Sequence, residues 1–148
     1  MTLFEKMTGD LKSAMKGGQK ARVEVLRFVI AGITNAQKEK NVKQPGVALT
    51  DEEVVSVLQK EAKRRKEALE LFRQGKRDDL VNKEEGDLTV IGEYIPKELS
   101  GAEIEALVGE LIAKGASDFN TLMRETMKLV KGRADGKTVG DAIRKKLG

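Results

Sequence analysis

The chain has 148 residues, a net charge of +4 and 39% hydrophobic residues, enough apolar material for one ordinary domain or two small ones. It contains no cysteine and no histidine, which excludes disulfides, thiolate catalysis and the commonest zinc ligands and general base. Aromatic residues make up only 3%, so the core must be built from aliphatic side chains, which pack well between helices. We therefore expect an all-α fold without a metal or a cofactor, and we nominate no catalytic residue.

Apolar residues are spread along the chain in short groups. No stretch approaches the roughly 18 consecutive apolar residues of a membrane-spanning helix. No basic segment followed by an apolar one precedes a small-residue cleavage site. We therefore expect neither membrane insertion nor secretion, and we expect a cytoplasmic location.

The first half of the chain shows the three- and four-residue spacing of amphipathic helices. This spacing predicts one helix from Leu3 to Lys16, ended by Gly17-Gly18, and a second from about Lys20 to Asn41. A third helix should begin at Thr50-Asp51-Glu52-Glu53, which has the spacing of a capping box, and close at Gln74-Gly75. The apolar face of the second helix is predicted to comprise Val23, Leu26, Ile30, Ile33 and Gln37.

A charged pair interrupts the apolar face of the third helix. Glu61 and Arg65 lie four residues apart with the acid first, so we interpret them as an intrahelical ion pair whose aliphatic stems cover the edge of the core. Such a pair contributes a few tenths of a kcal/mol if it is exposed. The alternative, a carboxylate poised for acid–base chemistry, would require a second partner and a cleft.

A fourth helical pattern begins at Asp78 or Asp79 and continues to Tyr94. Pro96 then disfavours helical geometry at the residue before it. The segment from Tyr94 to Leu99 is therefore the predicted boundary between two domains. Residues 1–95 should form a domain of about four helices, and residues 96–148 a smaller one.

Three further helices are predicted after this boundary. Ser100-Gly101-Ala102-Glu103 repeats the capping-box spacing and opens a helix that Gly115 ends. Asp118 can cap the next helix and Asp135 the last. Three helices in about fifty residues form a small bundle that can sustain its own core.

Positive charge is concentrated in two segments. Residues 60–77 carry eight Lys and Arg against three Glu, and residues 124–148 carry eight against three Asp and Glu. Residues 97–123, by contrast, carry two against five. Exposed cations on a helix are often only a solvated face, so these segments support nucleic-acid binding without requiring it.

The segment from Val130 to Lys137 is the strongest candidate for a working surface. Gly132 and Gly136 allow the backbone to turn through positive φ, and Asp135 is placed to cap the helix that follows. The segment also contains three cations, Lys131, Arg133 and Lys137. Such a corner suits a phosphate group. On the alternative interpretation, Gly132 only ends one helix, Asp135 only begins the next, and the cations solvate the turn.

Two motifs resemble those of a known family. Tyr94-Ile95-Pro96-Lys97-Glu98-Leu99-Ser100, followed by an acidic helix, and Val130-Lys131-Gly132-Arg133-Ala134-Asp135-Gly136-Lys137 resemble the YqeY family. The C-terminal part of that family is similar to the tail domain of the GatB subunit of glutamine-dependent tRNA amidotransferases. The resemblance extends upstream through Arg77–Val81 and Lys60–Glu67, and so covers nearly the whole chain. It implies an N-terminal helical domain and a smaller C-terminal one.

In the amidotransferase the tail domain helps to hold tRNA, so the resemblance implies a tRNA- or RNA-binding accessory protein. Arg124 and Lys128 depart from the family pattern and enlarge the basic face that leads into Lys131. The nucleic-acid-binding residues that we predict are Arg124, Lys128, Lys131, Arg133, Lys137, Arg144 and Lys145. Structural roles are predicted for Pro96, Gly132, Asp135 and Gly136. Because there is no Trp and the four Phe are assigned mostly to the core, recognition should be of backbone shape and not of unpaired bases.

Two other functions stay open. One is a protein-interaction adaptor that docks on an amidotransferase or an aminoacyl-tRNA synthetase complex. The other is a carbon–nitrogen ligase with glutamine as the amide donor, a function that the family inherits by association. A ligase requires a nucleophile and a nucleotide site, and the sequence has neither a Ser-Ser-Lys amidase arrangement nor a phosphate-binding P-loop.

Overall fold

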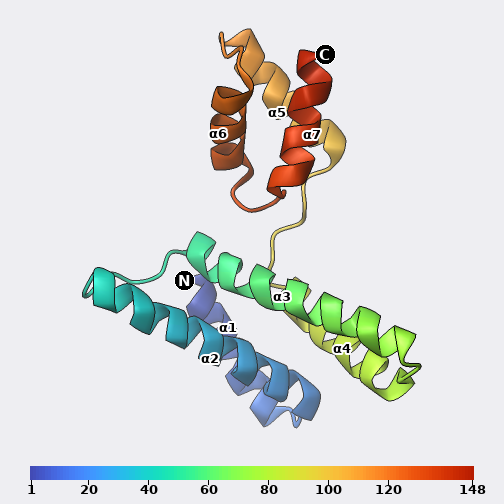
Figure 1. Ribbon diagram of the computed structural model, residues 1–148. Helices are drawn as coiled ribbons and strands as arrows, with labels where there is room; N and C mark the ends of the chain where they lie inside the picture. The colour runs from blue at the N-terminus through green and yellow to red at the C-terminus, as the bar shows by residue number, and fades with distance from the viewer. The chain divides into compact units, whose positions relative to one another are not determined.

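The computed structural model describes residues 1–148 and consists of seven α-helices without a strand (Figure 1). The helices are α1 (Leu3–Lys16), α2 (Lys20–Lys43), α3 (Asp51–Gln74), α4 (Asp78–Gly92), α5 (Gly101–Ala113), α6 (Phe119–Val130) and α7 (Gly136–Leu147). The predicted all-α class is confirmed. None of these helices is both long enough and apolar enough to cross a membrane.

Side-chain caps explain where five of the helices begin. Thr2, Thr50 and Ser100 each form a complete capping box with a glutamate three residues later, at the starts of α1, α3 and α5. Asp118 and Asp135 cap α6 and α7 through their carboxylates. Each cap supplies a partner for a backbone N–H that the first helical turn leaves unpaired, which typically contributes about 1 kcal/mol.

Two helices are followed by a lysine in the left-handed backbone conformation. Lys76 follows α3 with φ of 55°, and Lys131 follows α6 with φ of 48°. Glycine is the residue that usually adopts this conformation, because in other residues the Cβ atom crowds the following carbonyl oxygen. A glycine adjoins each lysine. Gly75, before Lys76, has φ of −79°, whereas Gly132, after Lys131, is itself left-handed with φ of 79°.

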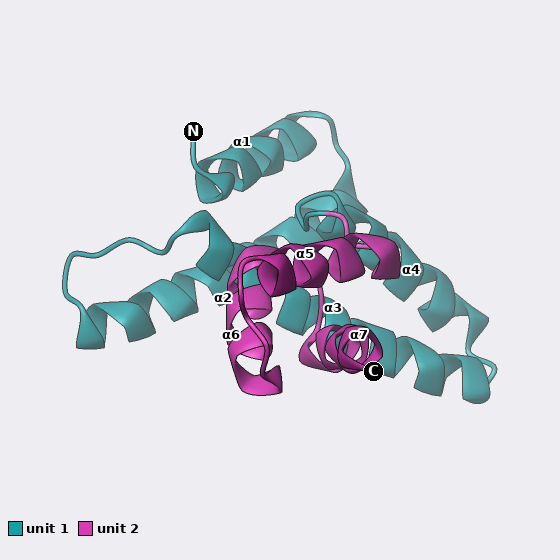
Figure 2. Cartoon of the chain, turned by 90° about the horizontal axis from the view of Figure 1, so that it is seen from above, with its two compact units in different colours: residues 1–96 teal, residues 97–148 magenta.

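The chain forms two compact units, which are coloured separately in Figure 2. The N-terminal unit comprises residues 1–96 and contains α1 to α4; the C-terminal unit comprises residues 97–148 and contains α5 to α7. The residues around Pro96 are not helical, as expected from the restriction that proline places on the residue before it. Independent folding of the two units stays a prediction.

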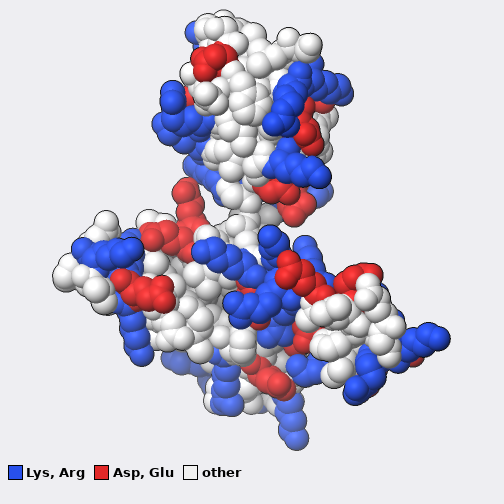
Figure 3. Space-filling model, in the orientation of Figure 1, with Lys and Arg blue, Asp and Glu red and all other residues white.

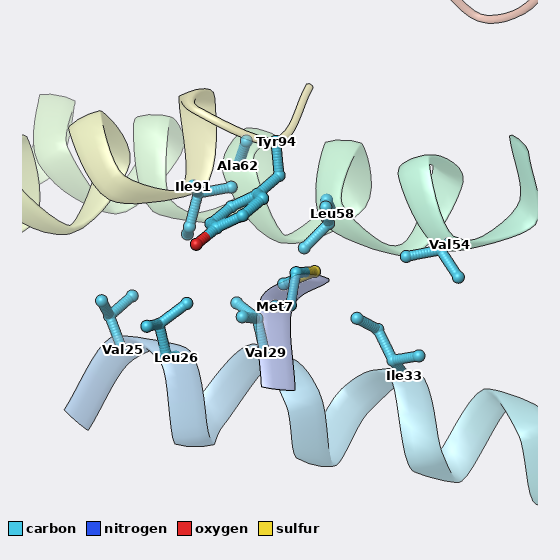
Figure 4. Packing of buried hydrophobic residues seen from close by; sticks show 10 residues of the cluster. All are labelled: Met7, Val25, Leu26, Val29, Ile33, Val54, Leu58, Ala62, Ile91 and Tyr94. Atoms are coloured by element: carbon cyan, nitrogen blue, oxygen red, sulfur yellow. The ribbon is translucent and has the colours of Figure 1, made fainter. Parts of the chain in front are cut away.

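An aliphatic core holds the N-terminal unit together. Helix α3 packs along α4 and α1 along α2, while α2 also contacts both α3 and α4. Met7, Leu26 and Leu58 are completely buried. Figure 4 shows side chains from all four helices and from Tyr94 meeting in this core: Met7, Val25, Leu26, Val29, Ile33, Val54, Leu58, Ala62, Ile91 and Tyr94.

The buried face of α2 differs from the predicted one. Leu26 and Ile33 are buried as expected, but Val25 and Val29 are buried in place of Val23 and Ile30, which are only partly covered. The reason lies in the neighbours of α2. Because α1, α3 and α4 all contact this helix, its orientation is set by three partners and not by its own apolar stripe.

In the C-terminal unit, each of the three helices contacts the other two. Their core includes the completely buried residues Ile104, Val108, Leu122, Val130, Val139 and Ile143. Thr126 of α6 is also completely buried, and its hydroxyl has no hydrogen-bond partner. A buried hydroxyl without a partner destabilises the folded state, so this small core contains one unfavourable polar group.

Candidate nucleic-acid interface

The connection between α6 and α7 lies within the segment from Val130 to Lys137, which the sequence analysis identified as the strongest candidate for a working surface. Lys131 and Gly132 turn through φ of 48° and 79°. Gly136 is the first residue of α7 and does not have positive φ, so the prediction that it provides a left-handed turn is wrong. The chain has already reversed at Lys131 and Gly132. At Gly136 a Cβ atom would lie at an ordinary van der Waals distance, 3.5 Å, from Cε of Met123, so the space between α6 and α7 does not by itself require glycine there.

Asp135 occupies the N-terminus of α7. Its Oδ1 accepts a hydrogen bond from the backbone N–H of Thr138 at 2.7 Å. A phosphate approaching this helix end would therefore meet a carboxylate already bound there. The backbone corner is not an open phosphate site, and an anion would have to be held by the cationic side chains. Lys137, which is exposed in the first turn of α7, is one of these.

Arg133 is tied to the start of the C-terminal unit. Its Nε donates a hydrogen bond to the carbonyl of Lys97 at 2.8 Å, and its own carbonyl accepts one from the N–H of Leu99 at 2.8 Å. These two bonds fasten the α6–α7 loop to the segment before α5. This role could not be predicted from the sequence, because the two segments are far apart in the chain. Arg133 is therefore a positioning residue for the loop as well as a cation.

The two predicted cations on α6 share one acidic neighbour. Arg124 and Lys128 are exposed, and each lies 3.5 Å from Oε1 of Glu125. Exposed ion pairs of this kind contribute little to stability, and water competes for both partners. Both cations therefore stay accessible to a polyanion.

The predicted cations on α7 have separate acidic partners. Arg144 pairs with Asp141 at 3.2 Å, and its guanidinium lies 5.1 Å from the centre of the Phe119 ring. Lys145 pairs with Glu105 of α5 at 2.9 Å, and this contact lowers the pKa of the Glu105 carboxyl. The side chains of both cations remain more than half exposed.

The charges of the C-terminal unit are segregated along the chain. The unit carries ten Lys and Arg against eight Asp and Glu, and eight of the ten cations lie on α6, α7 and their connection. On the face drawn in Figure 3, its Lys and Arg side chains flank an uncharged strip of surface and do not merge into one patch. The predicted residues thus form a distributed set of cations.

A second charged cluster lies in the N-terminal unit, around Arg65. Its Nε bonds Glu61 at 3.0 Å, and its Nη1 lies 3.3 Å from Glu84 and 2.8 Å from Asp87 of α4. The side chains of all four residues are at most 15% exposed. The intrahelical pair inferred from the sequence is present, but it is part of a larger network that joins α3 to α4.

This network offers no free base. Each of its three carboxylates contacts the Arg65 guanidinium, and Asp87 also pairs with Lys83 at 3.2 Å. The contact with Asp87 raises the pKa of Lys83, which keeps the lysine protonated. Asp87 was missed by the sequence reasoning, because the burial of an acid depends on a partner from another helix. No group of three or more acidic side chains is arranged to hold a metal ion.

Comparison with known proteins identifies related chains. The model of a family described as "Yqey-like protein" matches residues 4–147. A protein of Pyrenophora tritici-repentis named "Altered inheritance of mitochondria protein 41, mitochondrial" is 33% identical over 153 residues, which cover 99% of this chain and 81% of the relative. A Saccharomyces cerevisiae protein of the same name is 29% identical over 99 residues, covering 67% of this chain and 51% of the relative. An uncharacterized protein of Schizosaccharomyces pombe is 34% identical over 90 residues, or 61% of this chain and 69% of that protein.

These relatives correct one expectation. The cytoplasmic location expected from the sequence is contradicted by the names of the Pyrenophora and Saccharomyces proteins, which place those relatives in mitochondria. Composition and hydropathy describe the folded body of a protein, and they do not specify its compartment.

Proposed function

The chain belongs to the family of Yqey-like proteins, and from this premise we propose that it is an RNA-binding accessory protein whose C-terminal unit holds phosphates of a structured RNA such as tRNA. The contacts assigned to this role come from Arg124, Lys128, Lys131, Lys137, Arg144 and Lys145, with Arg133 positioning the loop between α6 and α7. We choose tRNA first because the C-terminal part of the chain resembles the tail domain of tRNA amidotransferases.

The observation that carries this proposal is the placement of two lysines. Lys131 adopts a left-handed conformation in which glycine would cost less, and Lys137 lies at the positive end of α7, where an acidic residue would be more stable. Both side chains are exposed, so neither is there to fill the core. Residues that oppose local stability in this way concentrate at functional sites. Phosphate binding would explain why a lysine occupies each of these two unfavourable positions.

Salt dependence tests the proposal. If two to four phosphates are neutralised, the slope of log affinity for tRNA against log salt should be about −1.5 to −3.5, using roughly 0.7 to 0.9 per phosphate. Changing Lys131 and Lys137 together to Ala should flatten this slope by about 1.4 to 1.8. Arg133 is left intact, because its loss would also release the loop. The matched control changes Lys12 and Lys16, two exposed lysines of α1, to Ala. Equal slopes for the parent and the Lys131/Lys137 variant would refute this interface.

A protein-interaction adaptor is the second candidate. It is supported by the uncharged strip of the C-terminal unit in Figure 3 and by Leu129 and Leu147, which are 48% and 44% exposed. Capture of a translation-related complex that survives nuclease treatment and is lost on changing Leu129 and Leu147 to Ser would favour it over RNA binding. Because relatives carry mitochondrial names, mitochondrial tRNAs and their synthetases are the first partners to test.

A further inference from the structure

Phe28 is not part of the core, contrary to the expectation for the phenylalanines of this chain. It lies on α2, and 53% of its surface is exposed. The guanidinium of Arg65 lies over its ring, 5.1 Å from the ring centre. Arg65 is itself held by three carboxylates, so the ring is supported from one side by a fixed cation. The result is a rigid aromatic surface that is half open to solvent.

This ring lines a groove of about 490 Å³ between α2 and α3, entirely within the N-terminal unit. Small residues of α2, Ala31, Gly32 and Ala36, widen the groove, and Val57 of α3 lines its other wall. A volume of this size falls within the range of small-ligand sites. Aromatic and apolar walls of this kind accept a flat, partly apolar group.

The same groove carries polar groups suited to a nucleotide. Lys60 and Arg64 line the α3 side, where both are exposed, and Asn35 lies on the α2 side. Two carboxylates, Glu39 of α2 and Glu61 of α3, also line the groove. The Arg64 side chain is 75% exposed and has only a long contact of 3.4 Å with Glu61, so its guanidinium is accessible. Figure 3 shows Lys and Arg side chains over the middle of α3. Two cations next to an exposed aromatic ring match the phosphates and the base of one nucleic-acid strand.

We propose that the α2–α3 groove binds an unpaired base of single-stranded RNA. The base stacks on Phe28, the amide of Asn35 faces its polar edge, and Lys60 and Arg64 hold the flanking phosphates. This inference rests on the proposed function in taking RNA as the ligand. It adds a different site, in the other unit, for a different part of the RNA. It also replaces the expectation that stacking is unimportant in this protein.

Tryptophan fluorescence tests the stacking directly, because the chain has no Trp. Phe28→Trp in the full chain creates a single reporter in the groove. Its emission should be quenched by a single-stranded RNA of about ten nucleotides and not by a blunt RNA duplex. The control is Leu71→Trp, at an exposed position of α3 outside the groove, whose emission should not change. An unquenched Phe28→Trp variant, at RNA concentrations that saturate binding by anisotropy, overturns the proposal.

The RNA affinities of Phe28 variants show whether the groove stacks a base or only makes an apolar contact. Phe28→Ala should weaken binding of the single-stranded RNA by about 5- to 100-fold, and Phe28→Leu should weaken it nearly as much, because stacking requires an aromatic ring. Changing Lys60 and Arg64 to Ala should flatten the salt dependence, whereas Lys63→Ala, on the same helix but outside the groove, should affect it less. If Phe28→Leu binds RNA as the parent does, the groove serves an apolar contact and the proposal fails.

The two RNA sites can fail separately. The Lys131/Lys137 variant should keep both the quenching and the dependence on Phe28, because the groove lies in the other unit. If that variant alone weakens RNA binding while Phe28→Ala has no effect, the groove proposal is wrong and the proposed function stands. If only the Phe28 variants weaken binding, the interface on the C-terminal unit is wrong. If the parent chain binds neither tRNA nor single-stranded RNA, both are wrong.

Discussion

The hydroxyl of Tyr94 donates a hydrogen bond to Oδ2 of Asp10 over 2.5 Å, which ties the last residues of the N-terminal unit to its first helix. Tyr94 is 5% exposed and part of the core, and Nη2 of Arg22 donates to the same hydroxyl at 3.3 Å. Tyr94→Phe keeps the packing and removes the hydroxyl. We expect it to lower the free energy of unfolding by about 1 to 2 kcal/mol, measured by urea denaturation followed by circular dichroism.

The same tyrosine predicts an alkaline pH dependence. Burial, together with the hydrogen bond to Asp10, raises the pKa of the Tyr94 hydroxyl above its ordinary value of 10.0. Since the folded state favours the neutral form, the stabilisation is fully present below pH 10 and is lost as the unfolded chain ionises above it. The parent should therefore lose more stability between pH 9 and pH 11 than Tyr94→Phe does. Parallel losses in the two proteins would mean that Tyr94 ionises freely in the native state.

Arg65 should be the most important charge for the stability of the N-terminal unit. Removing it leaves Glu61, Glu84 and Asp87 close together and largely buried, so Arg65→Met should cost about 3 kcal/mol or more. The neighbouring Arg64→Met is the control. Its side chain is 75% exposed, so we expect a change within about 0.5 kcal/mol. Comparable losses from the two variants would show that the network contributes no more than a surface pair.

Limited proteolysis should cut first between the two units. Residues 95–100 are not helical, and Pro96, Lys97 and Glu98 are exposed. A protease needs several residues of accessible extended chain, which the helices on either side do not offer. Mass spectrometry should therefore identify early fragments that end or begin within residues 92–101. Early cleavage elsewhere, with this segment intact, would argue that residues 1–96 and residues 97–148 fold together and not independently.

The two left-handed lysines form a natural comparison. Lys131→Gly and Lys76→Gly should each raise the free energy of unfolding by about 0.5 to 1 kcal/mol, because glycine adopts positive φ without the Cβ clash. Only Lys131→Gly should also weaken tRNA binding, since Lys76 belongs to the N-terminal unit and is not a residue of the proposed interface. If both substitutions changed tRNA affinity equally, the left-handed conformation of Lys131 would have no specific role in tRNA binding.

Thr126 offers a stabilising substitution. Its hydroxyl is completely buried without a partner, and valine has nearly the same shape, so Thr126→Val should raise the free energy of unfolding by about 1 kcal/mol. Thr126→Ser keeps the hydroxyl and loses the methyl group, and it should be destabilising. Thermal unfolding of the two variants checks both signs. A destabilised Thr126→Val protein would indicate that the hydroxyl has a partner in solution.

Local features of the fold could be derived from the sequence because they depend on residues close together in the chain. The capping boxes at Thr50 and Ser100, the aspartate caps at Asp118 and Asp135, and the break at Pro96 each involve at most a few neighbours. The aliphatic core followed from composition in the same way. Seven helices and the absence of strands were therefore predictable.

Only the tertiary structure decided which side chains meet across helices. The burial of Asp87, the exposure of Phe28, the Tyr94–Asp10 bond and the attachment of Arg133 to Lys97 each depend on a partner 12 or more residues away. A helix's own periodicity limits which face is buried, but its orientation is set by all of its neighbours together. For that reason the cations and the helix ends could be predicted from the sequence. The groove beside Phe28 could not, because it is formed by residues of two helices, α2 and α3, that pack together.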